Sequence, residues 1–375
     1  MAGHICSRGK NTWLVRVYMG TDAEGKRKNH NKTIHGTKKE AQAYLNKVLR
    51  EKDTGSFVDP SKEFIKDFMD NWLENVAKPR IRAKTYRSYE QLVRLYIKPS
   101  LGDIKLSQLT PAQIHSMYSK MTEEELSSRT VRYTHTVLRN ALDQAVKFGE
   151  LYRNPADIVD LPRHEKKEMK ALTPEEAARF LSATTCSTLK PLFSLMVTTG
   201  MRPSEALGLK WPDVDLNNGR ITVNRILSRT GKHWKLEEPK TTRSRRTIPL
   251  SVTVIKDLRE HKKKQSVIIL AAEEGKYNEQ DFVFADDTGE PLSDRNIIAR
   301  HFKPLLKDAK LPDIRLYDLR HTCATLLLSA GENPKVVSER LGHANITLTL
   351  DTYSHVLPDM QQGAADKLEE LLFNV

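Results

Sequence analysis

Two polar linkers, at which the spacing of apolar residues changes, constrain the fold of this chain more than any other feature. The linkers DTGSFVDPS (Asp53–Ser61) and RHEKKEMK (Arg163–Lys170) divide its 375 residues into three regions. Apolar residues alternate before the first linker, recur at helical spacing between the linkers, and show both spacings afterwards. Because a domain usually holds roughly 100–200 residues, we expect separate domains at residues 1–58, 59–165 and 171–375.

The N-terminal region predicts a small basic module. Trp13–Tyr18 alternates as a strand does, and a turn-rich segment leads to a second strand near residues 32–34. Thr37 is placed to cap a helix over residues 38–52. Residues 1–55 hold twelve Lys and Arg against five Asp and Glu, so the sheet either enters a DNA groove, as β-ribbon readers do, or is a solvated hairpin. The candidate DNA contacts here are Arg16, Lys26, Arg27 and Lys28.

The middle region predicts an all-helical domain. Its apolar residues recur at helical spacing, and glycine and proline interrupt the pattern between helices. Helices are expected over residues 63–76, 84–97, 111–121 and 129–148. A basic stretch near the second helix either contacts DNA phosphates or is a solvated face. The candidate DNA contacts in this stretch are Arg82, Lys84 and Arg87.

The third region predicts a mixed helical and β domain. Thr173 and Glu176 have the spacing of a capping box, so a helix should begin there. An apolar helix then ends at a glycine, and Arg202 follows at the junction with the next helix, at the rim of a core. Strands are expected at residues 220–227, 233–236 and 245–250. Lys240 falls in the turn between the last two strands.

Charge and composition narrow the function classes. Lysine and arginine outnumber the acids 61 to 48, which gives a net charge of +13 and favours an anionic polymer as partner over a merely basic protein. Mean hydropathy is −0.55. No apolar run approaches the ~20 residues of a membrane span, and the N-terminus lacks the apolar core of a signal peptide, so we expect a cytoplasmic protein with no membrane partner. Three scattered cysteines, without a ligand cluster or a phosphate-binding glycine-rich loop, predict no disulfide framework, no metal site and no cofactor.

A C-terminal stretch, residues 318–356, concentrates reactive side chains. It holds Arg320, a glycine-flanked His343 and Tyr353, a selection that neither packing nor helix propensity explains. Apolar spacing does not decide what Tyr353 does. A helix would place it on one face with Leu350, which suits a core tyrosine, and a strand fits the pattern equally well.

Four boxes in register give the chain a specific resemblance. TTGMRPSEALGLKW, EPKTTRSRRTIPL, LYDLRHTCATLLLSAG and LGHANITLTLDTYSHV resemble, in that order, the catalytic boxes of the tyrosine recombinases, the phage integrase family. SLGDIKLSQLTPAQI and NPA resemble its core-binding domain, and the basic N-terminus is similar to the arm-binding domain of integrases from phages and conjugative transposons. The resemblance covers nearly the whole chain. It implies a multidomain α+β fold with a small three-stranded-sheet arm-binding domain, an all-α core-binding domain, and a mostly α catalytic domain with a small antiparallel sheet and a C-terminal tail helix.

The resemblance assigns charge stabilisation and proton transfer to basic residues. Arg202 and Arg320 would hold the scissile phosphate, because guanidinium groups are planar, bidentate and permanently charged. Lys240 would protonate the leaving 5′ oxygen, with Lys232 and Lys235 as nearby alternatives. The second box also supplies one further candidate DNA contact, Arg243.

The resemblance also assigns the nucleophile, and here the chain departs from the family pattern. The TxxxY pattern, matched by Thr349 and Tyr353, favours a helix that presents Tyr353 as nucleophile. His343 would bind the phosphate or assist proton transfer. Many relatives carry histidine three positions before the second arginine, whereas this chain has Tyr317, a weak base near neutral pH that is as compatible with a structural as with a catalytic role. The base that deprotonates the nucleophile is therefore open, with His343 or water as candidates and His321 as a supporting residue.

The implied function is site-specific recombination that integrates and excises a mobile element through a 3′-phosphotyrosyl intermediate, without metal or ATP. The implied partners are double-stranded DNA at core and arm sites, other protomers in a DNA-bound tetramer, and an excisionase-type accessory protein. The resemblance implies a bacterial cytoplasmic protein that associates with the nucleoid when bound to DNA. A type IB topoisomerase and a catalytically silent DNA-binding regulator are the alternatives, and strand exchange between two sites and covalent DNA cleavage would discriminate them.

Overall fold

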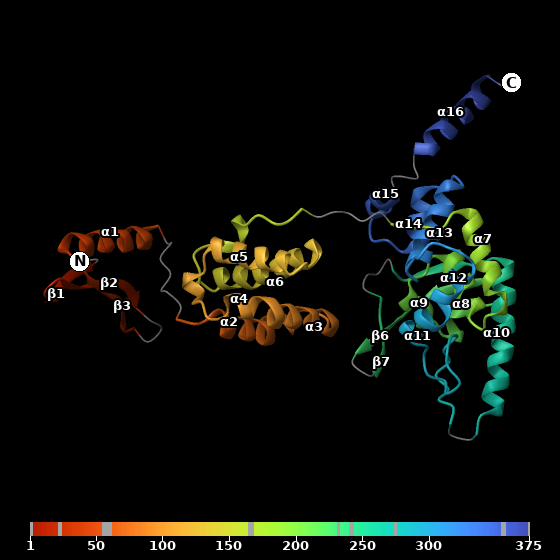
Figure 1. The fold of residues 1–375 in the computed structure, drawn as a ribbon, viewed down its shortest axis with the longest axis horizontal. Coiled ribbons are helices and arrows are strands. Elements are labelled where there is room, and N and C mark those ends of the chain that lie inside the picture. Colours follow the sequence, from red (N-terminus) through yellow and green to blue (C-terminus); the bar gives the residue numbers. More distant parts are fainter. Residues whose placement is uncertain are drawn as a thin grey trace. The chain divides into compact units, whose positions relative to one another are not determined.

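The computed structural model describes residues 3–21, 25–54, 62–163, 169–230, 233–239, 244–273, 276–353 and 358–373. The chain forms two compact units, Met1–Lys166 and Lys167–Val375 (Figure 1). Within the described ranges, none of the helices combines the length and the apolar content that crossing a membrane requires.

The N-terminal part of the first unit is a three-stranded antiparallel sheet, in the order β1-β2-β3, covered by one helix. Its elements are β1 (Gly3–Gly9), β2 (Thr12–Thr21), β3 (Arg27–His35) and α1 (Lys38–Asp53). Val15 and Val17 on β2 are buried against Ala41 and Leu45 on α1. Thr37 caps α1 in a capping box, as its sequence predicts. The residue pattern did not reveal β1, because most of its side chains are exposed and it therefore shows little apolar alternation.

The remainder of the first unit is helical, and the expected helices are all present. Its elements are α2 (Ile65–Asn71), η1 (Trp72–Ala77), α3 (Ala83–Leu92), η2 (Val93–Ile97), α4 (Lys98–Leu101), η3 (Leu106–Gln108), α5 (Pro111–Glu123), α6 (Ser128–Lys147) and η4 (Pro155–Ile158). The segments η1 and η2 are π-helical continuations of α2 and α3. The apolar faces of these helices form one core, in which the rings of Trp72 and Tyr89 stack with centroids 6.1 Å apart.

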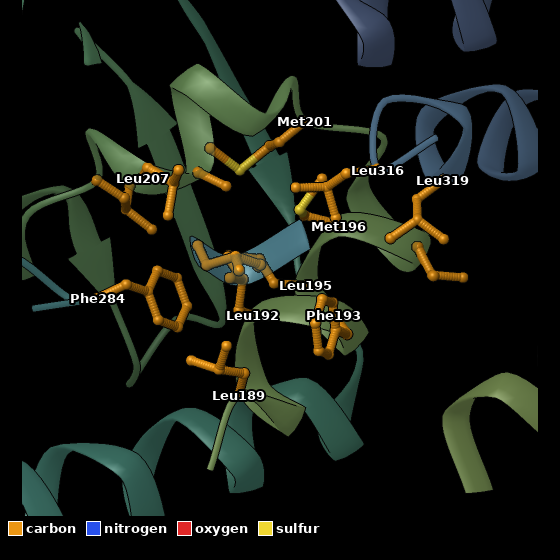
Figure 2. Packing of buried hydrophobic residues seen from close by; sticks show 14 of the residues in the cluster. Leu189, Leu192, Phe193, Leu195, Met196, Met201, Leu207, Phe284, Leu316 and Leu319 are labelled. Atoms are coloured by element: carbon orange, nitrogen blue, oxygen red, sulfur yellow. The ribbon is translucent and has the colours of Figure 1, made fainter. Parts of the chain in front are cut away.

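The second unit surrounds its core with helices and two small sheets. Its helices are α7 (Pro174–Ala183), η5 (Thr184–Cys186), α8 (Lys190–Thr199), α9 (Pro203–Leu207), η6 (Trp211–Asp213), α10 (Val252–Ala271), α11 (Asp294–Ile297), η8 (Ile298–Phe302), α12 (Lys303–Asp308), α13 (Asp318–Ser329), α14 (Pro334–Leu341), α15 (Ile346–Tyr353) and α16 (Pro358–Phe373). The helix α8 is the centre of the core, because Leu192, Phe193, Leu195 and Met196 are all buried there (Figure 2). Thr173 begins α7 with the predicted capping box.

The strands of the second unit differ from the expected hairpin. They are β4 (Val214–Asp215), β5 (Arg220–Val223), β6 (Ile226–Thr230), β7 (His233–Glu237) and β8 (Arg246–Pro249), arranged as a sheet β4-β5-β8 and a sheet β6-β7. The strand predicted at 220–227 is broken at Asn224 and Arg225, whose side chains both donate to Asp213 Oδ1, at 2.9 and 3.2 Å. Because β7 pairs with β6 and β8 pairs with β5, the segment after β7 connects two sheets and does not close a β7–β8 hairpin. Lys240, predicted in that turn, lies outside the described residues.

Candidate active site

The turn between α8 and α9 places the first predicted arginine. Gly200 ends α8 with φ +66°, a left-handed conformation that favours glycine, and a Cβ there would lie 2.5 Å from a methyl group of Leu341. Arg202 then precedes α9, and Glu205 secures it twice: Arg202 Nη1 donates to Oε1 at 2.5 Å, and its backbone N–H donates to Oε2 at 3.0 Å. The Arg202 side chain stays 28% exposed, so a ligand can reach it.

Arg320 on α13 is joined to the same turn. It is fully buried, and its Nη1 donates to the carbonyl oxygen of Gly200 at 2.8 Å. Its Nη2 is also buried and has no hydrogen-bond partner among the described residues. Burial and the nearby charge of Arg202 lower the pKa of Arg320, although a guanidinium stays protonated at neutral pH. An unsatisfied buried donor beside another arginine suits an anion, because such a donor is costly to leave unpaired.

A buried carboxylate organises the arginines around this turn. Glu205 accepts from Arg202 and also from Arg246 Nη2 on β8, at 2.9 Å, and only 1% of its side chain is exposed. Arg246 Nε in turn donates to the carbonyl oxygen of Arg340 at 2.6 Å, and Arg340 Nη2 donates to that of Thr198 at 2.9 Å. Burial acts to raise the pKa of Glu205, but the charges and hydrogen bonds of the two arginines outweigh it and lower that pKa. The turn, β8 and α14 are thereby fixed to one another.

His343 lies close to Arg320, Arg202 and Arg246. It follows Gly342, which ends α14 with φ +67°. Its Nδ1 lies 2.7 Å from Thr349 Oγ1 on α15, which fixes the orientation of the ring. Burial, and then the charges of Arg320 and Arg202, lower the pKa of His343 to about 3, so the imidazole is neutral near pH 7.

Tyr353 is at the C-terminal end of α15, and only 1% of the side chain is exposed. Its hydroxyl lies 2.7 Å from His321 Nδ1 on α13. Burial raises the pKa of Tyr353 above its ordinary value, and Arg320 is the charge that opposes this rise. The helix chosen by the TxxxY pattern is present, and Thr349 and Tyr353 share its buried face. Leu350, expected beside Tyr353, is 36% exposed, because the buried face turns toward the two histidines.

Tyr317 occupies the position at which the sequence departs from the family pattern. It is 38% exposed, and Arg202 donates a hydrogen bond to its hydroxyl. Its ring packs edge-on against His321, with centroids 5.4 Å apart. Burial acts to lower the pKa of Arg202, but Glu205 and Tyr317 raise it above its ordinary value. Tyr317 therefore joins the environment of an arginine to that of the histidine that contacts Tyr353.

Arg202, Arg320, His343, Tyr353 and Tyr317 are thus brought together, whereas two predicted residues, Lys240 and Arg243, lie outside the described residues. Residue patterns did not identify Glu205, Arg246 or the contact made by His321. Glu205 had a usable signal, because it stands three residues after Arg202 at the start of a helix, the spacing of a capping box. The described residues hold no group of three or more His, Cys, Asp and Glu side chains that could bind a metal ion.

The candidate DNA contacts of the first unit lie on its surface. Arg16 on β2 is half-buried, and its Nε donates to Asn31 Oδ1 on β3 at 2.9 Å. The others are exposed: Lys26 just before β3, Arg27 and Lys28 at the start of β3, Arg82 just before α3, and Lys84 and Arg87 on α3. Their exposure leaves these side chains accessible to a polyanion.

Known proteins are similar to this chain in sequence and in fold. Residues 170–360 match the family described as the phage integrase family, and residues 64–122 match the phage integrase N-terminal SAM-like domain. The XerC-like tyrosine recombinase of Caldanaerobacter subterraneus subsp. tengcongensis is 33% identical over 97% of each chain. The ICEBs1 integrase of Bacillus subtilis is 30% identical over 76% of this chain and 78% of its own. The solved structure of the Tn1549 transposon integrase in complex with a circular intermediate DNA has a TM-score of 0.70, with 24% identity over 82% of this chain and 100% of that chain.

Proposed function

The chain belongs to the phage integrase family of tyrosine recombinases, and on that premise we propose that Tyr353 is the nucleophile that cleaves and rejoins its DNA. One observation carries the assignment. The Tyr353 side chain is buried where Arg320 influences it electrostatically, and the buried Nη2 of Arg320 has no hydrogen-bond partner among the residues that the structure describes. A phosphate oxygen is the kind of acceptor that such a donor lacks.

The proposed reaction has two reciprocal steps. The Tyr353 oxygen attacks the scissile phosphorus, the bond to the 5′ oxygen breaks, and a 3′-phosphotyrosyl linkage conserves the bond energy. The freed 5′ hydroxyl of a partner strand then attacks that linkage and releases the tyrosine. Arg202 and Arg320 stabilise the negative charge that gathers on the phosphate oxygens, and Lys240 protonates the leaving oxygen. Loss of one preorganised donor of this kind costs on the order of 2.7–4 kcal/mol of transition-state stabilisation.

We infer that the DNA substrates are the ends and the target site of a mobile element, which the enzyme integrates and excises. This proposal rests on family membership, and it is supported by the ICEBs1 integrase and the Tn1549 transposon integrase among the similar proteins. Exchange between two duplexes cuts four strands, and each protomer supplies one tyrosine, so the active assembly is a tetramer on DNA. The basic sheet of the first unit binds arm sites, the helical domain binds core sites, and domain boundaries near residues 58 and 165–171 separate the three functions.

The same proposal includes the cellular location of the enzyme and an accessory protein. It acts in the bacterial cytoplasm, on the nucleoid, because its substrate is chromosomal DNA. An excisionase-type accessory protein sets the direction of recombination, since the chemistry of each strand exchange is reversible and nearly isoenergetic.

A covalent-trapping experiment tests this function. Nicked duplexes tiled across the DNA that flanks the coding sequence lose the short fragment after cleavage, so the adduct accumulates and is counted on denaturing gels. We expect an adduct with the wild-type enzyme and none with Tyr353→Phe, which retains DNA binding. Binding without an adduct in the wild type would instead indicate a silent regulator. Adduct without strand exchange between two labelled duplexes would indicate a topoisomerase-like activity.

A further inference from the structure

His321 makes a direct contact with the proposed nucleophile that the proposed function leaves unused. Its Nδ1 lies 2.7 Å from the Tyr353 hydroxyl, and the two rings are 5.8 Å apart between centroids. Both side chains are buried, at 6% and 1% exposure. In the tautomer whose ring hydrogen is on Nε2, the Nδ1 atom of His321 accepts the hydrogen bond that the Tyr353 hydroxyl donates.

The other candidate proton acceptors near this site make different contacts. His343 Nδ1 lies against Thr349 Oγ1, and among the described residues no hydrogen bond joins His343 to Tyr353. The Tyr317 hydroxyl accepts from Arg202 and belongs to a phenol, a weak base near neutral pH. Among the buried carboxylates close to this site, Glu205 pairs with two arginines and Asp318 pairs with Arg315 at 2.7 Å. Within the part of the chain that the structure describes, only His321 is hydrogen-bonded to the Tyr353 hydroxyl.

We propose that His321 is the catalytic base of the cleavage step, which rests on the assignment of Tyr353 as nucleophile. As the Tyr353 oxygen bonds to phosphorus, its O–H bond breaks and the proton moves to His321 Nδ1, giving an imidazolium. The bond from phosphorus to the 5′ oxygen breaks, and that oxygen takes a proton from the general acid. In rejoining, the 5′ hydroxyl loses its proton to the acid's conjugate base, and His321 returns the first proton to the departing tyrosine. The proton count closes over one cycle.

The electrostatic surroundings of His321 keep it available as an acceptor. Burial lowers its pKa to about 4, and the charges of Arg320 and Arg315 add to that effect, while Asp318 opposes it. The ring is therefore neutral throughout the range in which the enzyme would be assayed. A base this weak cannot deprotonate Tyr353 before the attack begins, because burial raises the pKa of that tyrosine. It can accept the proton during attack, because bonding to phosphorus makes the phenolic hydrogen strongly acidic.

The pH dependence of single-turnover cleavage tests the proposal. Enzyme and nicked substrate are pre-bound, and the rate of adduct formation is measured from about pH 6 to pH 9 for wild type, His321→Asn and His321→Gln. General base catalysis contributes about 100-fold to 10,000-fold, and we expect a loss in that range at pH 7 for both variants. Without the base, the reaction needs tyrosinate, so the rates of both variants should rise about tenfold per pH unit relative to wild type. His301→Asn, the same substitution outside the site, controls for a general effect.

The slope of log rate against pH distinguishes the loss of a catalytic base from a structural defect. A folding or packing defect lowers the rate by the same factor at every pH in this range. Variant profiles parallel to wild type would overturn the proposal even if both rates are low. A substrate with a 5′ bridging sulfur adds a second criterion, since a thiolate leaves without protonation. The variants should stay slow on it, and full recovery would show that His321 serves the leaving group instead. Tyr353→Phe is assayed in the same experiment. An adduct formed by this variant overturns the proposed function. If it forms no adduct but the His321 variants have pH profiles parallel to wild type, only the role of His321 is overturned.

Discussion

Removing the charge of Glu205 should destabilise the second unit far more than removing a surface carboxylate. Glu205→Gln preserves the size of the side chain but changes an acceptor-only carboxylate into an amide with two donors. At present the carboxylate receives N–H groups from Arg202 and Arg246. The variant would turn an NH2 group toward one of these guanidiniums and leave two arginines with no counter-charge.

The burial of the pair sets the size of the effect. Glu205 is 1% exposed and Arg246 7% exposed, so water cannot replace the lost partner. Breaking a buried ion pair by removing one member costs roughly 3–5 kcal/mol. Since about 1 kcal/mol shifts Tm by roughly 2–4 °C in a unit of this size, we expect a fall of about 6–20 °C.

Thermal unfolding of the full chain, followed by calorimetry, measures this fall. The matched control is Glu339→Gln, which breaks an ion pair to Lys335 whose two side chains are 61% and 67% exposed, and should shift Tm by no more than about 2–4 °C. Because the folded pKa of Glu205 is lowered, its contribution is full above the ordinary carboxyl pKa and is lost as pH falls through the folded value. The gap between wild type and Glu205→Gln should therefore narrow on acidification below about pH 4. Equal Tm values for Glu205→Gln and the control at pH 7 would refute the reasoning.

Three further predictions follow from other parts of the structure. The folded state lowers the pKa of His321 to about 4 and that of His343 to about 3, so each histidine takes up a proton more readily when the chain is unfolded. The Tm of the wild type should therefore fall as the pH decreases from about 6.5 toward 4. The Tm of His343→Asn should fall less over the same range. Gly200→Ala should lower Tm by several degrees and slow cleavage, because it forces a left-handed backbone and a contact with Leu341; an unchanged Tm would contradict this. If β3 contacts phosphate, Lys28→Gln should weaken arm-site binding and reduce the slope of log K against log salt by about one, and an unchanged slope would exclude that contact.

Local signals in the sequence predicted most elements of the fold. Capping boxes at Thr37 and Thr173 mark real helix starts, because the residues that satisfy the first N–H groups of a helix are close in sequence. The strands of the second unit were harder to place. The break at Asn224 arises from its bond to Asp213 in an earlier element, and no short window contains both the residue and its reason.

The candidate site also combines residues that local sequence identified with contacts that it could not identify. Arg320, His343 and Tyr353 stand in short boxes whose order is informative. The contacts that hold them are long-range: Arg320 reaches Gly200 across 120 residues, and Arg246 reaches the carbonyl of Arg340 across 94. The spacing of residues in one sequence could not show that His321, and not the residue three positions before Arg320, is hydrogen-bonded to Tyr353. That contact depends on how α13 and α15 pack.

The most direct test of the central claim is to identify the residue that becomes bonded to DNA. The trapped adduct is digested with nuclease and trypsin, and the nucleotide-bearing peptide is sequenced by mass spectrometry. Cleavage after Arg340 and Lys367 gives a peptide of residues 341–367, whose only tyrosine is Tyr353. Tyr317 falls in a separate peptide, LYDLR. We predict a nucleotide on Tyr353, and a nucleotide on any other residue would contradict the account.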